Sequence, residues 1–243
     1  MLNNLPQVTK NILILNIMFF VASFFLGTQG INLIQDFGAH YVNSPFFEPF
    51  QLVTHFFMHA DFFHILFNMW LFVILGAHLE KMWGPKRFFI FYLVSAFAAF
   101  ALFNMIGVYE IETLKEQLVQ DGNTLSTINQ AILNDNSFEY FGDKYTVERY
   151  IGMVKTPMVG ASGAIFGVMA ASTILFPNTT FYLYFAVPVK AKYLVGAYLA
   201  YTVYKVFNPS EMDNVAHLAH LGGAIAGAVM VLYWRKKDRS NFW

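Results

Sequence analysis

The chain has 243 residues, of which 57% are hydrophobic, 19% aromatic and 12% charged. A soluble domain with this balance could not cover its surface with polar groups, so the composition indicates a membrane protein. The 15 basic residues balance the 15 acidic ones, which argues against nucleic-acid binding because that function requires a basic surface. The chain has no cysteine, which excludes disulfides, thiolate metal sites and a cysteine nucleophile.

Membrane spans are the first elements that the sequence predicts, because about 20 apolar residues in a helix cross a bilayer. The polar N-terminus lacks a basic run and no small-residue cleavage site follows, so we expect the first apolar stretch to remain as a span. Six stretches are long and apolar enough, or nearly so: 11–27, 62–79, 88–107, 158–176, 185–206 and 215–234. We therefore predict an all-α membrane protein, a six-helix transmembrane bundle that forms a single domain over residues 1–243.

The distribution of basic residues predicts the orientation, since lysine and arginine gather on the cytoplasmic side of membrane proteins. With the N-terminus inside, the inner segments hold ten of the 15 basic residues and two of the 15 acidic ones. The inner basic residues are Lys10, Lys81, Lys86, Arg87, Lys190, Lys192, Arg235, Lys236, Lys237 and Arg239. Both termini are thus predicted to lie inside.

Two connections on the predicted outer side are long. Residues 28–61 contain no lysine or arginine and are rich in Phe, Pro and His, which is typical of a loop partly embedded at the membrane interface. Residues 108–157 are polar and mixed in charge, so we interpret them as an extramembrane insertion between the third and fourth helices. Within this insertion, short helices are predicted near 110–120 and 124–133.

Polar side chains at membrane depth are costly unless they pair or line a cavity, so each is a candidate functional residue. His64 and Asn68 lie four residues apart on one face of the second helix, Ser162 lies near the start of the fourth, and His220 near the start of the sixth. Because these three helices run in the same direction, we expect the four side chains at a similar depth. They would supply a nucleophile, a proton acceptor and hydrogen-bond donors, the groups that acyl transfer requires.

Small residues follow the candidate serine and histidine and would let their helices approach closely. The glycines near the candidate site are Gly160, Gly163, Gly167, Gly223 and Gly227. Gly223 and Gly227 continue the face of His220, and Gly163 and Gly167 form a second stripe beside Ser162. Packing one stripe against the other would bring the serine near the histidine.

Each of these residues also has a structural interpretation. A serine among small residues is more often a packing residue, and an isolated membrane histidine or asparagine more often joins two helices. His55 and His59 precede the second helix and suggest a metal site with His64, but this spacing is a weak signal and favours a local structural role. A transporter built on His64, His217 and His220 is disfavoured, because the sequence shows no pair of broken helices and predicts no buried acid to couple protons. A site-2-type metalloprotease is disfavoured because the sequence lacks His-Glu-x-x-His.

At these positions the chain resembles the rhomboid family of intramembrane serine proteases. The matching motifs are Gly160-Ala161-Ser162-Gly163, His64-x-x-x-Asn68, and Ala219-His220 followed by Gly223-x-x-x-Gly227. The resemblance covers residues 11–235, apart from an insertion longer than a minimal rhomboid loop. It implies a bilayer-embedded endopeptidase that cuts in or near the transmembrane helix of single-pass protein substrates, without a metal or other cofactor.

The resemblance also implies a role for each matched residue. Ser162 would attack the substrate carbonyl, and His220 would take its proton and later deliver it to the leaving amine, as a dyad without an aspartate. The oxyanion would be bound by the His64 and Asn68 side chains and by the backbone N–H of Ser162. His217, one turn before His220, is a rival for the base, but His220 has the family's spacing to the glycine that follows.

One departure from the family concerns the first outer loop. Many rhomboids carry a Trp-Arg pair there, and the matching residues in this chain are Phe50 and Gln51. We therefore expect the hydrogen bonds of the arginine to be lost, which leaves open how the loop is anchored.

The alternative function is a catalytically inactive rhomboid-like protein that binds membrane helices. Such relatives typically lack the serine or the histidine, and both are present here. The short N-terminus without targeting features suits a bacterial inner membrane, which is the localisation that the sequence predicts.

Overall fold

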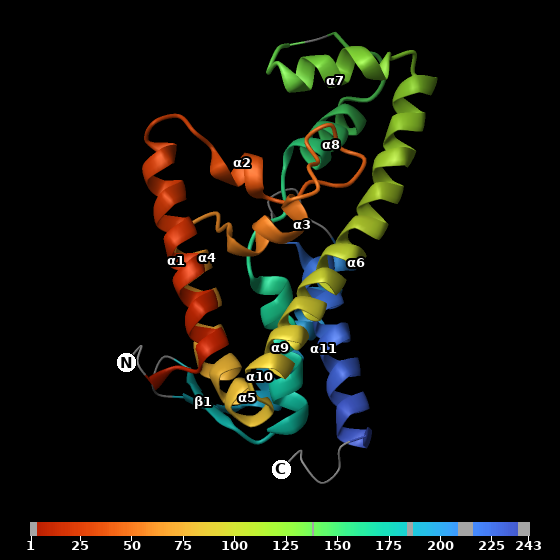
Figure 1. The fold of residues 1–243 in the computed structure, drawn as a ribbon. Helices are drawn as coiled ribbons and strands as arrows, with labels where there is room; N and C mark the ends of the chain where they lie inside the picture. Colours follow the sequence, from red (N-terminus) through yellow and green to blue (C-terminus); the bar gives the residue numbers. More distant parts are fainter. Residues whose placement is uncertain (1–3, 138, 184–186, 209–215, 238–243) are drawn as a thin grey trace.

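The computed structural model describes residues 4–137, 139–183, 187–208 and 216–237. These residues form a helical bundle with a smaller helical layer at one end (Figure 1). The predicted starts of the fifth and sixth spans, Phe185 and Val215, lie outside the described residues, as does Arg239.

Each of the six predicted spans contains a helical segment. Four segments in the described residues are long and apolar enough to cross a membrane. They are α1 (Gln7–Gly27), the continuous run of α4 (Phe62–Leu71), the π-helix η3 (Phe72–Gly76) and α5 (Ala77–Trp83), then α6 (Pro85–Gln120) and α11 (His217–Lys237). The other two segments are shorter, α9 (Ser162–Leu175) and α10 (Ala191–Phe207).

The centre of the bundle is formed by α6, α9 and α11. Most side chains of α9 are buried, including Ile165 and Val168, so this helix is enclosed by its neighbours. Its apolar residues join the largest buried cluster of the molecule together with Phe72, Phe88 and Phe91. A helix that is apolar on every side is expected at such a central position.

The connection between α9 and α10 corrects the all-α prediction. It contains a two-stranded antiparallel sheet of β1 (Thr180–Leu183) and β2 (Val187–Lys190), in which Thr180 pairs with Lys190. The fifth helix therefore begins at Ala191, not at 185. Pro188 explains part of this difference, because a proline inside a helix removes a hydrogen bond and clashes with the preceding turn.

A buried carboxylate joins the first two spans at the end of the bundle where α1 begins. Glu80 of α5 accepts hydrogen bonds from the backbone N–H groups of Val8 and Thr9, at 2.8 and 2.7 Å. The Thr9 hydroxyl donates a third bond at 2.8 Å. These N–H groups belong to the first turn of α1, where backbone N–H groups have no acceptor within their own helix. The charge of Glu80 is thus stabilised by the positive end of a helix dipole.

The insertion is built on an extension of α6. This helix has 36 residues and is therefore about 54 Å long, against about 30 Å for the hydrocarbon core of a bilayer. The predicted helix at 110–120 is the outer part of α6, and the one near 124–133 is α7 (Leu125–Leu133). The sequence did not predict α8 (Lys144–Lys155). The insertion has a buried cluster formed mainly by Ile111, Leu118, Ile128, Ile132, Val147, Tyr150 and Val154.

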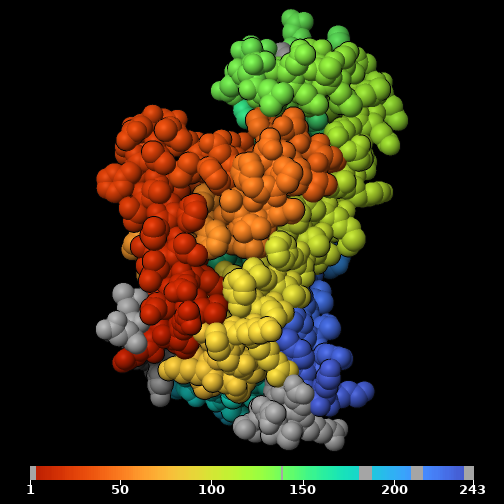
Figure 2. Space-filling model, in the orientation of Figure 1, coloured from red at the N-terminus to blue at the C-terminus, as the bar shows by residue number. Residues whose placement is uncertain are grey.

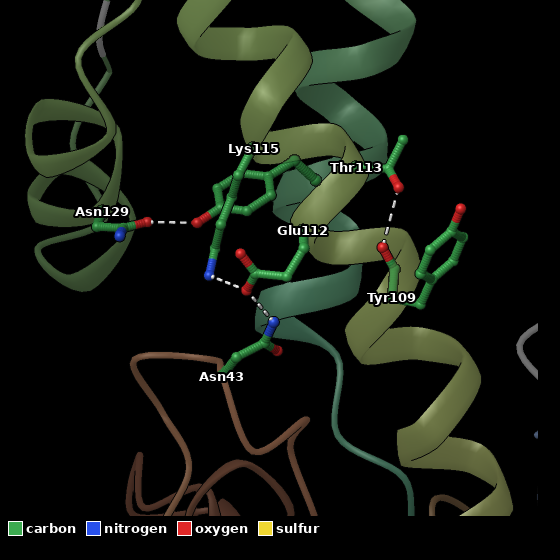
Figure 3. Close-up of polar contacts among 7 residues, drawn as sticks. Asn43, Tyr109, Glu112, Thr113, Lys115 and Asn129 are labelled. Atoms are coloured by element: carbon green, nitrogen blue, oxygen red, sulfur yellow. Dashed lines mark hydrogen bonds and ion pairs between the residues drawn. The ribbon is translucent and has the colours of Figure 1, made fainter.

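The loop between α1 and α4, with its short helices α2 (Leu33–Phe37), α3 (Gln51–Thr54) and η2 (His55–Phe57), packs against this insertion (Figure 2). The ring of Tyr41 stacks on Phe103 at 4.4 Å and covers Gly107, where a Cβ atom would overlap the ring. Asn43 donates a hydrogen bond to Glu112, which also pairs with Lys115 (Figure 3). The loop and the insertion therefore form one contiguous layer at this end of the bundle.

This layer continues toward the start of α9. The backbones of Ala39 and Met158 exchange two hydrogen bonds of 2.8 Å. The carbonyl of Val154, near the end of α8, accepts a bond of 2.8 Å from the Ser44 hydroxyl and lies 3.1 Å from His40 Nδ1. The segment that leads into Ser162 is thus held on one side by the first loop.

Candidate active site

Ser162 and His220 lie in contact inside the bundle. Ser162 is the first residue of α9 and is half-buried, whereas His220 lies one turn into α11 and is 6% exposed. Ser162 Oγ and His220 Nε2 are 2.9 Å apart, a hydrogen-bonding distance. A serine hydroxyl next to an imidazole is the arrangement in which the ring can take the proton as the oxygen attacks an electrophile.

Glycine contacts between the two helices set this separation. A Cβ atom on Gly223 would overlap the carbonyl oxygen of Gly163. One turn further along, a Cβ atom on Gly227 would lie 2.6 Å from Gly167 Cα. The backbones of α9 and α11 therefore touch at two levels directly beneath the serine and the histidine, as the small-residue stripes predict.

The imidazole of His220 is held by an aromatic contact. Its ring stacks on Phe166 with the centroids 4.1 Å apart and an angle of 11° between the planes. Phe166 lies one turn after Ser162 on α9, so one helix carries both the hydroxyl and the stacking ring. Among the described residues, none forms a hydrogen bond with His220 Nδ1. Phe166 was not among the predicted site residues, although its i+4 spacing from Ser162 places it on the same face of the helix.

His64 and Asn68 approach the chain two residues before Ser162. Gly160 has φ +110°, and a Cβ atom there would lie 2.8 Å from His64 Nε2 and 3.4 Å from Asn68 Nδ2. Glycine is therefore required both by the backbone conformation and by the close side chains. The four predicted site residues therefore come together around the first turn of α9. Gly160, predicted to be a helix-packing residue, lies in the segment just before α9 and makes room there for the side chains of His64 and Asn68.

His59 orients the side chain of Asn68. The distance between Asn68 Nδ2 and His59 Nε2 is 3.0 Å, and both residues are buried. Burial, reinforced by the neighbouring His64, lowers the pKa of His59 to about 3, so its ring is neutral near pH 7 and Nε2 accepts a hydrogen bond from the amide. One amide hydrogen is thereby directed at His59, and the other can point elsewhere.

His55 also serves the structure of the loop. Its Nδ1 donates a hydrogen bond of 2.6 Å to the carbonyl of Gln51, and burial lowers its pKa to about 4. Its own carbonyl accepts a hydrogen bond of 2.9 Å from the N–H of Gly160. Within the described part of the chain, no group of three or more His, Cys, Asp or Glu side chains could hold a metal ion.

Gln51 shows how the first loop is anchored, a question that the sequence left open. This residue is 1% exposed and makes four hydrogen bonds to the backbone of the loop. Its Nε2 donates to the carbonyls of Asp36 and Phe46 at 3.2 and 3.0 Å. Its Oε1 accepts from the N–H groups of His40 and Glu48 at 3.3 and 3.2 Å. A neutral amide can anchor the loop because it carries both donors and acceptors.

Comparison with known proteins identifies the family of this chain. The family model for the rhomboid domain matches residues 47–237. RHOMBOID-like protein 12, mitochondrial, of Arabidopsis thaliana is 26% identical over 191 residues, which cover 79% of this chain and 47% of the relative. Rhomboid protein 1, mitochondrial, of Saccharomyces cerevisiae is 26% identical over 184 residues, which cover 74% and 40%. Rhomboid-like protein 11, chloroplastic, of Arabidopsis thaliana is 24% identical over 242 residues, which cover 94% and 67%.

The chain spans about half the length of the curated relatives it matches. Their names place these relatives in mitochondria or chloroplasts, so they give no support to the expected bacterial type or bacterial inner membrane. The family match extends over most of the chain, and several helices are apolar and long enough to cross a bilayer. The chain is therefore a multi-pass membrane protein that belongs to the rhomboid family.

Proposed function

We propose that this rhomboid is an intramembrane serine endopeptidase that hydrolyses peptide bonds in or near the transmembrane helix of single-pass protein substrates. The observation that carries the proposal is the 2.9 Å separation of Ser162 Oγ and His220 Nε2. This separation lies within the range expected for a nucleophile and its general base. The catalytic unit is a Ser-His dyad.

The reaction proceeds by acyl transfer. Ser162 Oγ attacks the scissile carbonyl while His220 Nε2 takes its proton, and the proton then passes to the departing amine as the C–N bond breaks. The acyl-enzyme is hydrolysed by a water molecule, which His220 deprotonates in the same way. Phe166, stacked on the imidazole, keeps the ring in the plane from which Nε2 reaches the serine oxygen.

The developing oxyanion is bound by three donors: the side chains of His64 and Asn68 and the backbone N–H of Ser162. This assignment is supported by the position of His64 Nε2 and Asn68 Nδ2 beside Gly160. The N-terminal end of α9 adds a positive dipole where the negative charge forms. His59 fixes the Asn68 amide, so that the donor is oriented before the substrate binds.

The proposed topology has six transmembrane helices with both termini inside, and residues 108–157 form an outer insertion within the same domain. In support, α1 begins and α11 ends at the same end of the bundle (Figure 1). The 14 residues of α9 extend about 21 Å, less than the thickness of the hydrocarbon core. With α9 short and enclosed, Ser162 lies beneath the outer surface.

Substrate access requires a movement of the protein. The cavity beside Ser162 has a volume of about 10 Å³, about the space of one water molecule, and is lined in part by His55, Gly160 and Ala219. An extended peptide does not fit into this volume. The substrate helix must also unwind locally, because helical hydrogen bonds hide its carbonyls from attack.

The test compares the parent with Ser162→Ala and His220→Ala variants in mild detergent. A fluorophosphonate probe should label the parent and not the serine variant. Cleavage of a transmembrane peptide should fall by more than about a thousand-fold in both variants. Ser172→Ala, a buried serine of the same helix, is the matched control and should keep full labelling and cleavage. His217→Ala tests the rival base and should also retain activity.

Persistent cleavage by Ser162→Ala would contradict the mechanism. A folded parent that neither reacts with the probe nor cleaves the peptide would instead favour an inactive rhomboid-like protein that binds membrane helices.

A further inference from the structure

One end of the molecule is strongly basic. This end contains the first turn of α1, the junction of α5 with α6, the end of β2 and the end of α11 (Figure 1). Its described cations are Lys10, Lys81, Lys86, Arg87, Lys190, Lys192, Arg235, Lys236 and Lys237. Among the described residues, Glu80 is the acid at this end, and it is buried against the start of α1. The exposed charge that the described residues give to this end is therefore positive.

A cleft opens on this basic end where α5 turns into α6. The cleft is shallow and open along the surface, with a volume of about 390 Å³. The lining residues are Trp83, Gly84, Pro85, Lys86, Arg87 and Ile90. The cleft thus combines two cations with an apolar wall, and Ile90, 44% exposed, continues that wall along the outside of α6.

The cationic group of Arg87 is held in place beside the cleft. Its guanidinium carbon lies 4.3 Å from the ring centroid of Trp234, a cation–π distance. Trp234 in turn packs edge-on against Trp83, with the ring centroids 5.4 Å apart. Two tryptophans from α5 and α11 therefore form an aromatic support for one of the two cations in the cleft.

We propose that this cleft binds the headgroup of an anionic phospholipid. The phosphate would lie between Lys86 and Arg87, and an acyl chain would follow Ile90 along α6. Three observations favour a lipid: the cleft lies at the end of membrane-spanning helices, its charge complements a phosphate, and tryptophans of the kind that mark membrane interfaces border it. The proposal is independent of peptidase activity.

Native mass spectrometry of the full chain tests the proposal, with titrations of phosphatidylglycerol and of phosphatidylcholine that carry the same acyl chains. The parent should bind phosphatidylglycerol at least about ten-fold more tightly. Lys86→Gln should weaken this binding about five-fold, and Lys86→Gln with Arg87→Gln about 25-fold, since each cation near an anionic lipid contributes about a factor of five. Arg87→Lys should retain more affinity than Arg87→Gln.

The matched control is Lys190→Gln with Lys192→Gln, which removes two charges from the same end but outside the cleft. It should change the affinity by less than about two-fold. Equal weakening by both double variants would overturn the proposal in favour of diffuse attraction, as would equal binding of the two lipids. Because Lys86 is exposed, its single variant should keep the parent's melting temperature, and unchanged affinity in that variant would also overturn the proposal. Glycerol phosphate, a headgroup without acyl chains, should bind at least ten-fold more weakly.

Discussion

Replacing Gln51 with methionine should destabilise the first outer loop by about 3 kcal/mol. Methionine has nearly the same volume, so the change removes the hydrogen bonds of the amide with little loss of packing. Four backbone groups lose their partner, and each bond contributes roughly 1 kcal/mol. The sum of about 4 kcal/mol is reduced because Glu48 is exposed and water can replace the bond to its N–H.

The assay is reversible unfolding of the purified protein in mixed micelles, followed by circular dichroism over a denaturing-detergent titration. Val53→Ala is the matched control, because Val53 lies on the same short helix and is 48% exposed. Its effect should stay within about 0.5 kcal/mol. A loss below about 1 kcal/mol for Gln51→Met would refute the argument that this amide anchors the loop.

Two further predictions concern helix contact and pH. Gly223→Ala should lower the free energy of unfolding by about 1–3 kcal/mol and reduce probe labelling of Ser162, since the new methyl group overlaps Gly163. The control is Gly196→Ala, where a Cβ atom meets nothing within 4 Å. Equal melting temperatures of the two variants would contradict the close contact. Acidification should destabilise the loop that contains His55 and His59. Burial lowers their pKa values to about 4 and 3 in the folded protein, against 6.5 in the unfolded chain. The stability that the neutral histidines contribute is therefore complete above pH 6.5 and is lost as pH falls toward 4. At pH 5 each histidine should lower the free energy of unfolding by about 2 kcal/mol relative to neutral pH. The unfolding midpoints at pH 7.5 and pH 5 should therefore differ less in a His55→Gln variant than in the parent. An unchanged difference would contradict the assignment of the pH dependence to this histidine.

The sequence predicted the contact of Ser162 with His220 because two independent patterns agreed. The common direction of three helices placed the polar residues at one depth, and the glycine stripes supplied the close approach. The first pattern follows from the order of the predicted spans along the chain, and the second from the residue spacing within each helix. The structure adds the distance of 2.9 Å and the stacking of Phe166, which depend on how α9 is rotated relative to α11.

The errors arose where tertiary context overrides local signals. The apolar residues that follow 185 indicated a helix, but residues Val187–Lys190 form strand β2 and the helix starts only at Ala191. The hydrogen bonds of Gln51 join residues up to 15 positions apart, so no spacing rule reveals them. The single helix α6 was divided in the prediction, because its polar half resembles a separate surface helix.

The backbone contact of α9 with α11 has a consequence for control of the enzyme activity that we propose. With Gly163 against Gly223, no layer of side chains remains between the two helices that could repack and change their spacing. We therefore expect the distance between Ser162 Oγ and His220 Nε2 to change little when a substrate binds. On–off control of that activity would then act on the access of a ligand to Ser162, through the cavity of about 10 Å³ beside it, and not on the spacing of the serine and the histidine.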